Sequence, residues 1–181
     1  MHRPTYTFIC CLLLIGFAAC ATTENQPVKA PTESTGPSAP FAETMPAGEV
    51  VRVSAVATEL RAGEPAEATL QISIADGLHI NANPPTYSYL RATELTTEPT
   101  GNIVVTGPPV YPAAITKKFA FAEKPLAVYE GEAMIKLPLR AKRGAPKGAS
   151  TIRARLRVQP CDDEKCYPPR TIETSIPVVF K

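Results

Sequence analysis

The sequence contains no tryptophan, only two histidines and almost no net charge. A formal charge of +2 over 181 residues gives no electrostatic footprint for nucleic acid, so no nucleic-acid partner is expected. No long apolar run occurs beyond the N-terminal segment, so no internal transmembrane helix is expected. No phosphate-binding loop, Ser/His/Asp arrangement or pair of catalytic carboxylates is present, so no enzyme class defined by these motifs is supported.

Residues 1–19 have the features of a secretion signal: a positive start, a short apolar stretch and two small residues before Cys20. The motif Phe17-Ala18-Ala19-Cys20 resembles a bacterial lipobox, which predicts that Cys20 is lipidated. An ordinary signal peptide that ends near Cys20 is the alternative. The prediction is therefore a lipid-anchored protein of the cell envelope that faces the periplasm. Because Ala21 rather than aspartate follows the cysteine, the outer membrane is favoured over the inner membrane.

Residues 20–48 are rich in proline, threonine and serine and hold little that could be buried. Such a segment cannot offset the entropy lost on ordering, so it is predicted to be a disordered linker. The remaining residues, 49–181, are enough for one modest domain.

From residue 49 onward, apolar and polar residues alternate, as in antiparallel strands with one buried face. The clearest segments are 66–74, 135–141, 152–158 and 172–180, and weaker ones are 50–56, 94–97, 103–105 and 126–129. Turn residues separate them, and no stretch shows convincing helical periodicity. This pattern predicts an all-β fold, an immunoglobulin-like antiparallel β-sandwich.

The five cysteines divide into two groups. Cys10 and Cys11 leave with the predicted signal peptide, and Cys20 carries the predicted lipid. Cys161 and Cys166 remain, as an even pair in an oxidising compartment. They lie between two of the clearest strand segments, so we expect a hairpin connection at one end of the sandwich that brings both thiols close.

Three roles are open for this pair. A rigid turn suits a reversible disulfide, because the partner sulfur stays poised to attack a mixed disulfide. A structural disulfide is the second role, although its short ring contributes only about 2 kcal/mol through chain entropy. Metal binding is disfavoured, since two thiolates supply half a tetrahedral site and His79 is the only imidazole of the predicted mature chain. The acidic residues 162–164 are expected to raise the pKa values of the Cys161 and Cys166 thiols. Neither cysteine is then a strong attacking nucleophile, so a partner protein is expected to act on the pair.

Three segments resemble the family of N-terminal periplasmic domains of the thiol:disulfide interchange protein DsbD. They are residues 159–169 (QPCDDEKCYPP), 77–85 (GLHINANPP) and 128–132 (VYEGE), and the similarity extends over about residues 49–181. Four residues separate the cysteines, one fewer than in the best-known member of the family. The sequence ends at Lys181, before the membrane domain and the thioredoxin-like domain of the full protein. The electron donor is therefore expected to be a separate polypeptide.

The resemblance implies that the Cys161–Cys166 disulfide accepts electrons from a thioredoxin-like donor and passes them to periplasmic isomerases or cytochrome c maturation factors. This would make the chain a thiol–disulfide oxidoreductase of the protein-disulfide reductase type, without cofactor or metal. Family analogy points to Cys166 as the cysteine that faces the partner. The alternative is a non-enzymatic envelope binding module in which the same pair is a structural disulfide.

The resemblance also implies a cap loop at residues 117–123 that shields the disulfide, with Phe119 or Phe121 as the covering ring. Ordinary core packing is the alternative for both rings. His79 is interpreted as a structural residue, and a proton shuttle near the cysteines is its alternative role. A stripe of Arg153, Arg155 and Arg157 is interpreted as a solvated strand face, with a docking surface for an acidic partner as the alternative.

Overall fold

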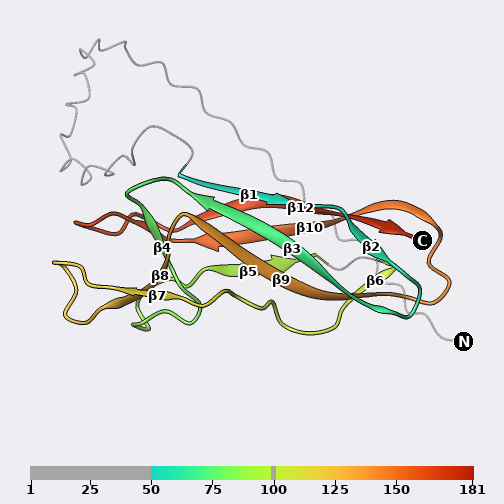
Figure 1. The fold of residues 1–181 in the computed structure, drawn as a ribbon, viewed down its shortest axis with the longest axis horizontal. Helices are drawn as coiled ribbons and strands as arrows, with labels where there is room; N and C mark the ends of the chain where they lie inside the picture. Colours follow the sequence, from blue (N-terminus) through green and yellow to red (C-terminus); the bar gives the residue numbers. More distant parts are fainter. Residues whose placement is uncertain (1–49, 99–100) are drawn as a thin grey trace, which may run out of the picture. The chain divides into compact units, whose positions relative to one another are not determined.

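The computed structural model describes residues 50–98 and 101–181. Every helix or strand assigned in these ranges is a β-strand (Figure 1). Within the same ranges, no helix is long and apolar enough to cross a membrane. The predicted signal peptide, the predicted lipidation at Cys20 and the predicted linker lie outside the described residues. The boundaries 1–19, 20–48 and 49–181 remain predictions.

The described residues form three four-stranded sheets. The first has the order β1-β3-β9-β6, made of Val51–Ala55, Pro65–Ile74, Glu132–Ala141 and Ile103–Val105. The second has the order β2-β12-β10-β5, made of Thr58–Leu60, Arg170–Phe180, Gly148–Val158 and Glu94–Thr97. The third has the order β11-β4-β8-β7, made of Pro160–Cys161, His79–Asn81, Leu126–Tyr129 and Ile115–Lys117. Neighbouring strands pair antiparallel except β2, which is parallel to β12.

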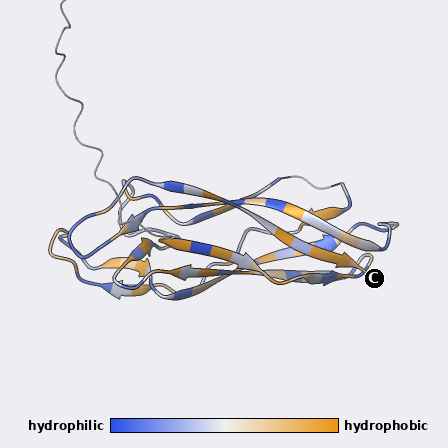
Figure 2. Cartoon of the chain, turned by 90° about the horizontal axis from the view of Figure 1, so that it is seen from above, coloured by the Kyte–Doolittle hydropathy of each residue, from blue (hydrophilic) through white to orange (hydrophobic). Residues whose placement is uncertain are grey.

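The first two sheets bury one face of each long strand in a common core. The alternation of hydrophobic and hydrophilic residues along these strands is visible in Figure 2. Fully buried side chains on this core include Leu70, Ile72, Ile135, Leu137, Ile152 and Leu156. Burial of one such side chain contributes about 1.5–3 kcal/mol. The predicted immunoglobulin-like β-sandwich is confirmed.

All eight segments predicted as strands are strands, and they correspond to β1, β3, β5, β6, β8, β9, β10 and β12. Four strands that the sequence did not predict are β2, β4, β7 and β11, none longer than three residues. A segment this short cannot display the alternation over four or more residues that marks a half-buried strand. Three of these four short strands belong to the third sheet.

The third sheet lies at one end of the two longer sheets, where β4, β7 and β8 are seen in Figure 1. One of its faces joins the main core through Ile80 and Tyr129, which are directly opposed on β4 and β8. Its other face carries a smaller cluster formed by Phe119, Leu126 and Val128. This division into two faces determines the surroundings of the cysteine pair.

Candidate functional site

The cysteine pair lies in a small hairpin that follows the long β10–β12 pairing. That pairing ends at Val158 opposite Arg170, and residues 159–169 connect the two strands. Within the connection, Cys161 is directly opposed to Cys166 in an antiparallel bridge. The amide of Tyr167 donates to the carbonyl of Pro160 at 2.8 Å. The hairpin adds β11 to the edge of the third sheet, as a partner of β4.

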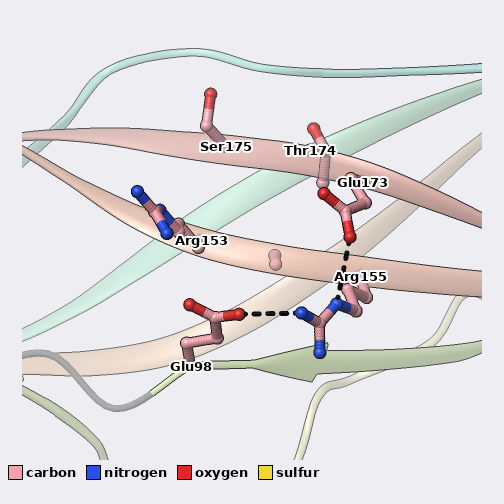
Figure 3. A pocket seen from close by; sticks show the side chains of 7 residues that line it. Glu98, Arg153, Arg155, Glu173, Thr174 and Ser175 are labelled. Atoms are coloured by element: carbon pink, nitrogen blue, oxygen red, sulfur yellow. Dashed lines mark hydrogen bonds and ion pairs between the residues drawn. The ribbon is translucent and has the colours of Figure 1, made fainter.

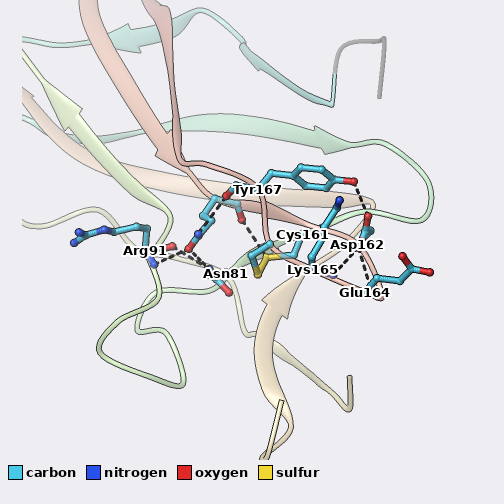
Figure 4. Close-up of a disulfide and its surroundings, with 9 residues drawn as sticks. Asn81, Arg91, Cys161, Asp162, Glu164, Lys165 and Tyr167 are labelled. Carbon is cyan, nitrogen blue, oxygen red and sulfur yellow. Dashed lines mark hydrogen bonds between the residues drawn. A yellow bond between two sulfur atoms is a disulfide. The ribbon is translucent and has the colours of Figure 1, made fainter. Parts of the chain in front are cut away.

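Cys161 and Cys166 form a disulfide (Figure 4), with Cα atoms 3.9 Å apart and sulfur atoms 2.04 Å apart. Cys161 is completely buried, whereas Cys166 is partly exposed. Cys166 therefore offers more of its surface to solvent than Cys161 does.

Asp162 organises the turn between the two cysteines. Its Oδ1 accepts the amides of Glu164 and Lys165, each at 2.8 Å, and its Oδ2 accepts the Tyr167 hydroxyl at 2.6 Å (Figure 4). Aspartate side chains commonly close turns in this way by accepting backbone amides two or three residues later. The Tyr167 hydroxyl and these amides lower the pKa of Asp162, so the carboxylate is charged at neutral pH.

A second set of hydrogen bonds fixes the base of the hairpin. The Gln159 side chain accepts the Asn81 amide group at 3.0 Å and the Arg91 backbone amide at 2.9 Å. Its own amide group donates to the Tyr167 carbonyl at 3.2 Å. These bonds connect β4, the loop before β5 and both arms of the hairpin (Figure 4). The position of the disulfide is therefore determined by contacts that come from distant parts of the sequence.

The acidic turn is balanced by a lysine that the sequence did not single out. Lys117 Nζ, at the end of β7, lies 2.8 Å from Glu130 and 3.3 Å from Asp163. Its hydrogen bond to Glu130 is the main reason that the pKa of Lys117 is raised, so the ammonium is charged at neutral pH. This places a positive charge beside the hairpin turn, in addition to that of Lys165.

The two aromatic rings predicted for the cap take different positions. Phe119 is buried, with 3% of its surface exposed, and its ring stacks on the ring of His79 at 4.2 Å. Phe121 is 42% exposed and stacks on the outer side of Phe119 at 5.4 Å. Phe119 packs in the smaller cluster of the third sheet rather than in the main core. The structure thus brings Phe119 to the sheet that carries the disulfide.

His79 is closer to the cysteine pair than its sequence position indicates. It lies on β4 directly opposite Cys161 on β11, and it is completely buried. Burial lowers the pKa of His79 and outweighs the opposing effect of acidic residues, of which that of Glu130 is the largest, so the imidazole is neutral. The sequence alone could not predict that His79 lies opposite Cys161, because β4 and β11 are far apart along the chain.

The arginine stripe lies on the outer face of the second sheet, beside a solvent-facing hollow of about 360 Å³ (Figure 3). Arg155 pairs with Glu98 at 3.0 Å and with Glu173 at 3.3 Å. Arg157 pairs with Glu94. These ion pairs compensate the positive charge locally and favour the interpretation of a solvated face.

No metal-ligand cluster is found in the part of the chain that the structure describes, where no three His, Cys, Asp or Glu side chains are grouped to hold an ion.

Comparison with known proteins places the chain in a family. A family model described as "Thiol:disulfide interchange protein DsbD, N-terminal" matches residues 42–177. The chain belongs to the DsbD N-terminal domain family. Membership confirms the resemblance seen in the sequence, and it supports thiol:disulfide interchange, thiol–disulfide oxidoreductase chemistry in general and a periplasm-facing location.

Two solved structures illustrate the range of similarity to this DsbD-type domain. The reduced N-terminal domain of DsbD from Neisseria meningitidis is 22% identical, with a TM-score of 0.40, and the match covers 60% of this chain and 74% of that chain. The N-terminal periplasmic domain of ScsB from Proteus mirabilis is 14% identical, with a TM-score of 0.49. That match covers 74% of this chain and 48% of the ScsB chain, so this chain spans about half of it. No curated protein sequence matches the chain.

Proposed function

We propose that this domain is a periplasmic electron relay. Its Cys161–Cys166 disulfide accepts two electrons from a thioredoxin-like donor and passes them to thiol proteins of the cell envelope. The observation that carries this proposal is the unequal burial of the two cysteines: Cys161 is enclosed and Cys166 is partly exposed. A disulfide that exchanges with protein partners needs one sulfur that the partner can reach and one that stays inside to act as the leaving and resolving group.

The exchange follows from this asymmetry. A donor thiolate attacks the sulfur of Cys166, the Cys161–Cys166 bond breaks, and its electron pair leaves on the sulfur of Cys161. The second thiolate of the donor then attacks the first donor sulfur in the mixed disulfide and releases Cys166 as a thiolate. The donor ends as a disulfide, and the pair ends as two thiols after taking up two protons. Reduction of an acceptor is the reverse sequence, with Cys161 resolving the mixed disulfide.

The charges around the hairpin support a passive role in the first step. Asp162 is ionised, and Asp163 and Glu164 are exposed on the same turn. Negative neighbours raise the pKa of a thiol and so reduce the fraction of attacking thiolate. Lys117 and Lys165 offset part of this effect. The reduced pair is therefore expected to react slowly with small oxidants and to need a docked partner.

The proposed relay also includes a cap over the disulfide, a membrane anchor and two kinds of partner. Residues 117–123 form a cap in which Phe119 covers the redox site from the side of His79. The lipid predicted at Cys20 and the linker at residues 20–48 tether the domain to a membrane, with the outer membrane favoured. The donor and the acceptor are separate thioredoxin-like proteins, with cytochrome c maturation factors among the acceptors.

Trapping of a mixed disulfide tests the relay. Cys161→Ser and Cys166→Ser variants of the whole chain are mixed with a thioredoxin-like protein whose single remaining active-site thiol has been activated as an aromatic disulfide. Cys161→Ser is expected to form a covalent complex, because the partly exposed Cys166 remains. Cys166→Ser is expected to form little, and the double variant is the control for non-specific capture. The absence of a complex with Cys161→Ser, together with a wild-type potential below about −300 mV, would support the structural disulfide of a binding module.

A further inference from the structure

His79 has no hydrogen-bond partner in the oxidised domain. The described residues contain three buried side-chain polar atoms without a partner, and two of them are Nδ1 and Nε2 of His79. The ring is completely buried and is stacked on Phe119. A buried polar group that makes no hydrogen bond destabilises the folded state, and native proteins leave few such groups. A binding partner that is present in only one redox state would account for this arrangement.

The strand register shows where such a partner lies. Cys161 is directly opposed to His79 on one side and to Cys166 on the other. Directly opposed residues project from the same face of a sheet, with Cβ atoms about 4.5–5.5 Å apart. The three side chains therefore form a row, with the sulfur of Cys161 between the imidazole and the sulfur of Cys166. An imidazole at this spacing can reach the neighbouring sulfur.

In the oxidised state, the Cys161 sulfur carries neither a proton nor a negative charge, so it offers His79 no strong hydrogen bond. Reduction changes this, because the sulfur becomes first a thiolate and then a thiol. A neutral imidazole has one N–H donor and one nitrogen acceptor, so it can bond to either form. We propose that His79 is the hydrogen-bond partner of the Cys161 sulfur once the disulfide opens, and that it thereby stabilises the leaving sulfur and the dithiol form. This inference rests on the proposed relay.

The charge of His79 does not change when the donor thiolate opens the disulfide. The donor thiolate forms a bond to Cys166, the Cys161–Cys166 bond breaks, and the electron pair stays on Cys161. The N–H of His79 donates a hydrogen bond to this thiolate, and the proton that later neutralises the sulfur comes from solvent. The charged groups that act on His79 are Glu130, Asp162 and Asp163, which favour a charged imidazole, and Lys117, which disfavours it.

Two substitutions separate hydrogen bonding from packing. His79→Phe keeps an aromatic ring against Phe119 but cannot bond to sulfur, whereas His79→Gln can bond but cannot stack. Equilibration of the whole chain with glutathione buffers measures the ratio of dithiol to disulfide for each variant. His79→Phe is expected to shift this ratio about tenfold toward the disulfide, which is about 30 mV for a two-electron couple. His79→Gln is expected to stay within about threefold of wild type.

Other results would overturn the role of His79. A ratio for His79→Phe equal to wild type would show that no hydrogen bond forms. A shift toward the disulfide in His79→Gln but not in His79→Phe would show that the ring only packs. The role of His79 is tested by the dithiol-to-disulfide ratio of each variant relative to wild type. The relay is tested by the wild-type reduction potential and by trapping of a mixed disulfide. The role of His79 and the relay can therefore fail separately.

A measurement on the wild-type chain needs no substitution. The ¹⁵N chemical shifts of the His79 ring are expected to change when the disulfide is reduced, because one nitrogen gains a sulfur partner. Unchanged shifts would overturn the inference even if both variants failed to fold.

Discussion

Replacement of Asp162 by alanine removes the carboxylate that closes the turn between Cys161 and Cys166. Three donors lose their acceptor at once: the amides of Glu164 and Lys165, each at 2.8 Å, and the hydroxyl of Tyr167 at 2.6 Å. Two backbone hydrogen bonds of the hairpin remain, because they do not involve the Asp162 side chain. In one, the Tyr167 amide donates to the Pro160 carbonyl, and in the other, the Asp162 amide donates to the Lys165 carbonyl. The substitution therefore isolates the contribution of the carboxylate to the turn.

The expected loss in unfolding free energy follows from these three bonds. A hydrogen bond to a charged group contributes about 1.5–3 kcal/mol when its donor is left unsatisfied by the substitution. Glu164 is exposed and Lys165 is partly exposed, so water can replace the lost acceptor at these amides. Of the three donor residues, only Tyr167 is buried. The total is therefore close to that of one such bond, about 1.5–2 kcal/mol at neutral pH.

The effect has a defined pH dependence. Hydrogen bonding, first of all from the Tyr167 hydroxyl, lowers the pKa of Asp162 below its ordinary value of 3.8. A carboxyl whose pKa is lower in the folded state stabilises the fold above its unfolded pKa, and this contribution is lost as the pH falls through the folded pKa. The stabilities of wild type and Asp162→Ala should therefore differ at pH 7 and converge in acid, as the pH falls through the folded-state pKa of Asp162, which lies below 3.8.

Denaturant unfolding of the oxidised protein at pH 7 and in acid measures the difference in unfolding free energy between wild type and Asp162→Ala. Asp163→Ala is the matched control, because Asp163 is exposed and its side chain approaches only Lys117 among the contacts described above. The control is expected to change the unfolding free energy by less than about 0.5 kcal/mol. Equal stabilities of wild type and Asp162→Ala at pH 7, or a difference that persists unchanged in acid, would refute the role of the carboxylate.

Three further substitutions test the surroundings of the disulfide. Phe119→Ala is expected to speed reduction of the disulfide by dithiothreitol, because it removes the buried ring over His79, whereas Phe121→Ala removes an exposed ring and should change the rate less. Quenched alkylation measures both rates, and equal rates would argue against Phe119 as the covering ring. Lys117→Met removes the cation that Glu130 and Asp163 share, so the thiol pKa of reduced Cys166 should rise. Titration of the thiolate absorbance measures this pKa, and an unchanged value would show that the charge of Lys117 does not reach the thiol.

The sandwich could be predicted from the sequence because its long strands have one buried face. In β9 and β10, buried and exposed positions alternate along most of each strand, and this period of two is visible in the amino-acid order itself. The third sheet has no such signal. All three residues of β4 are buried, polar and apolar alike, so it has no exposed face, and β11 has only two residues.

The same distinction applies to the site. The closeness of Cys161 and Cys166 could be predicted because a hairpin turn is a local feature of the chain. The opposition of His79 and Cys161 could not, because it depends on pairing between distant segments. The stacking of Phe119 on His79 has the same origin, since it requires that the third sheet has formed. Sequence reasoning therefore found the cysteine pair and named Phe119 and His79 as candidates near it, but it could not predict the contacts that these two residues make.

The two faces of the third sheet give a physical reason to favour exchange over a structural role for the disulfide. Ile80 and Tyr167 point into the main core, so the hairpin is attached to the sandwich through the face that lacks the cysteines. The hairpin is closed by backbone hydrogen bonds at 2.8 and 2.9 Å as well as by the disulfide. A ring this short contributes only about 2 kcal/mol through chain entropy. Opening the bond is therefore expected to leave the main core and its attachment intact, as the proposed exchange requires.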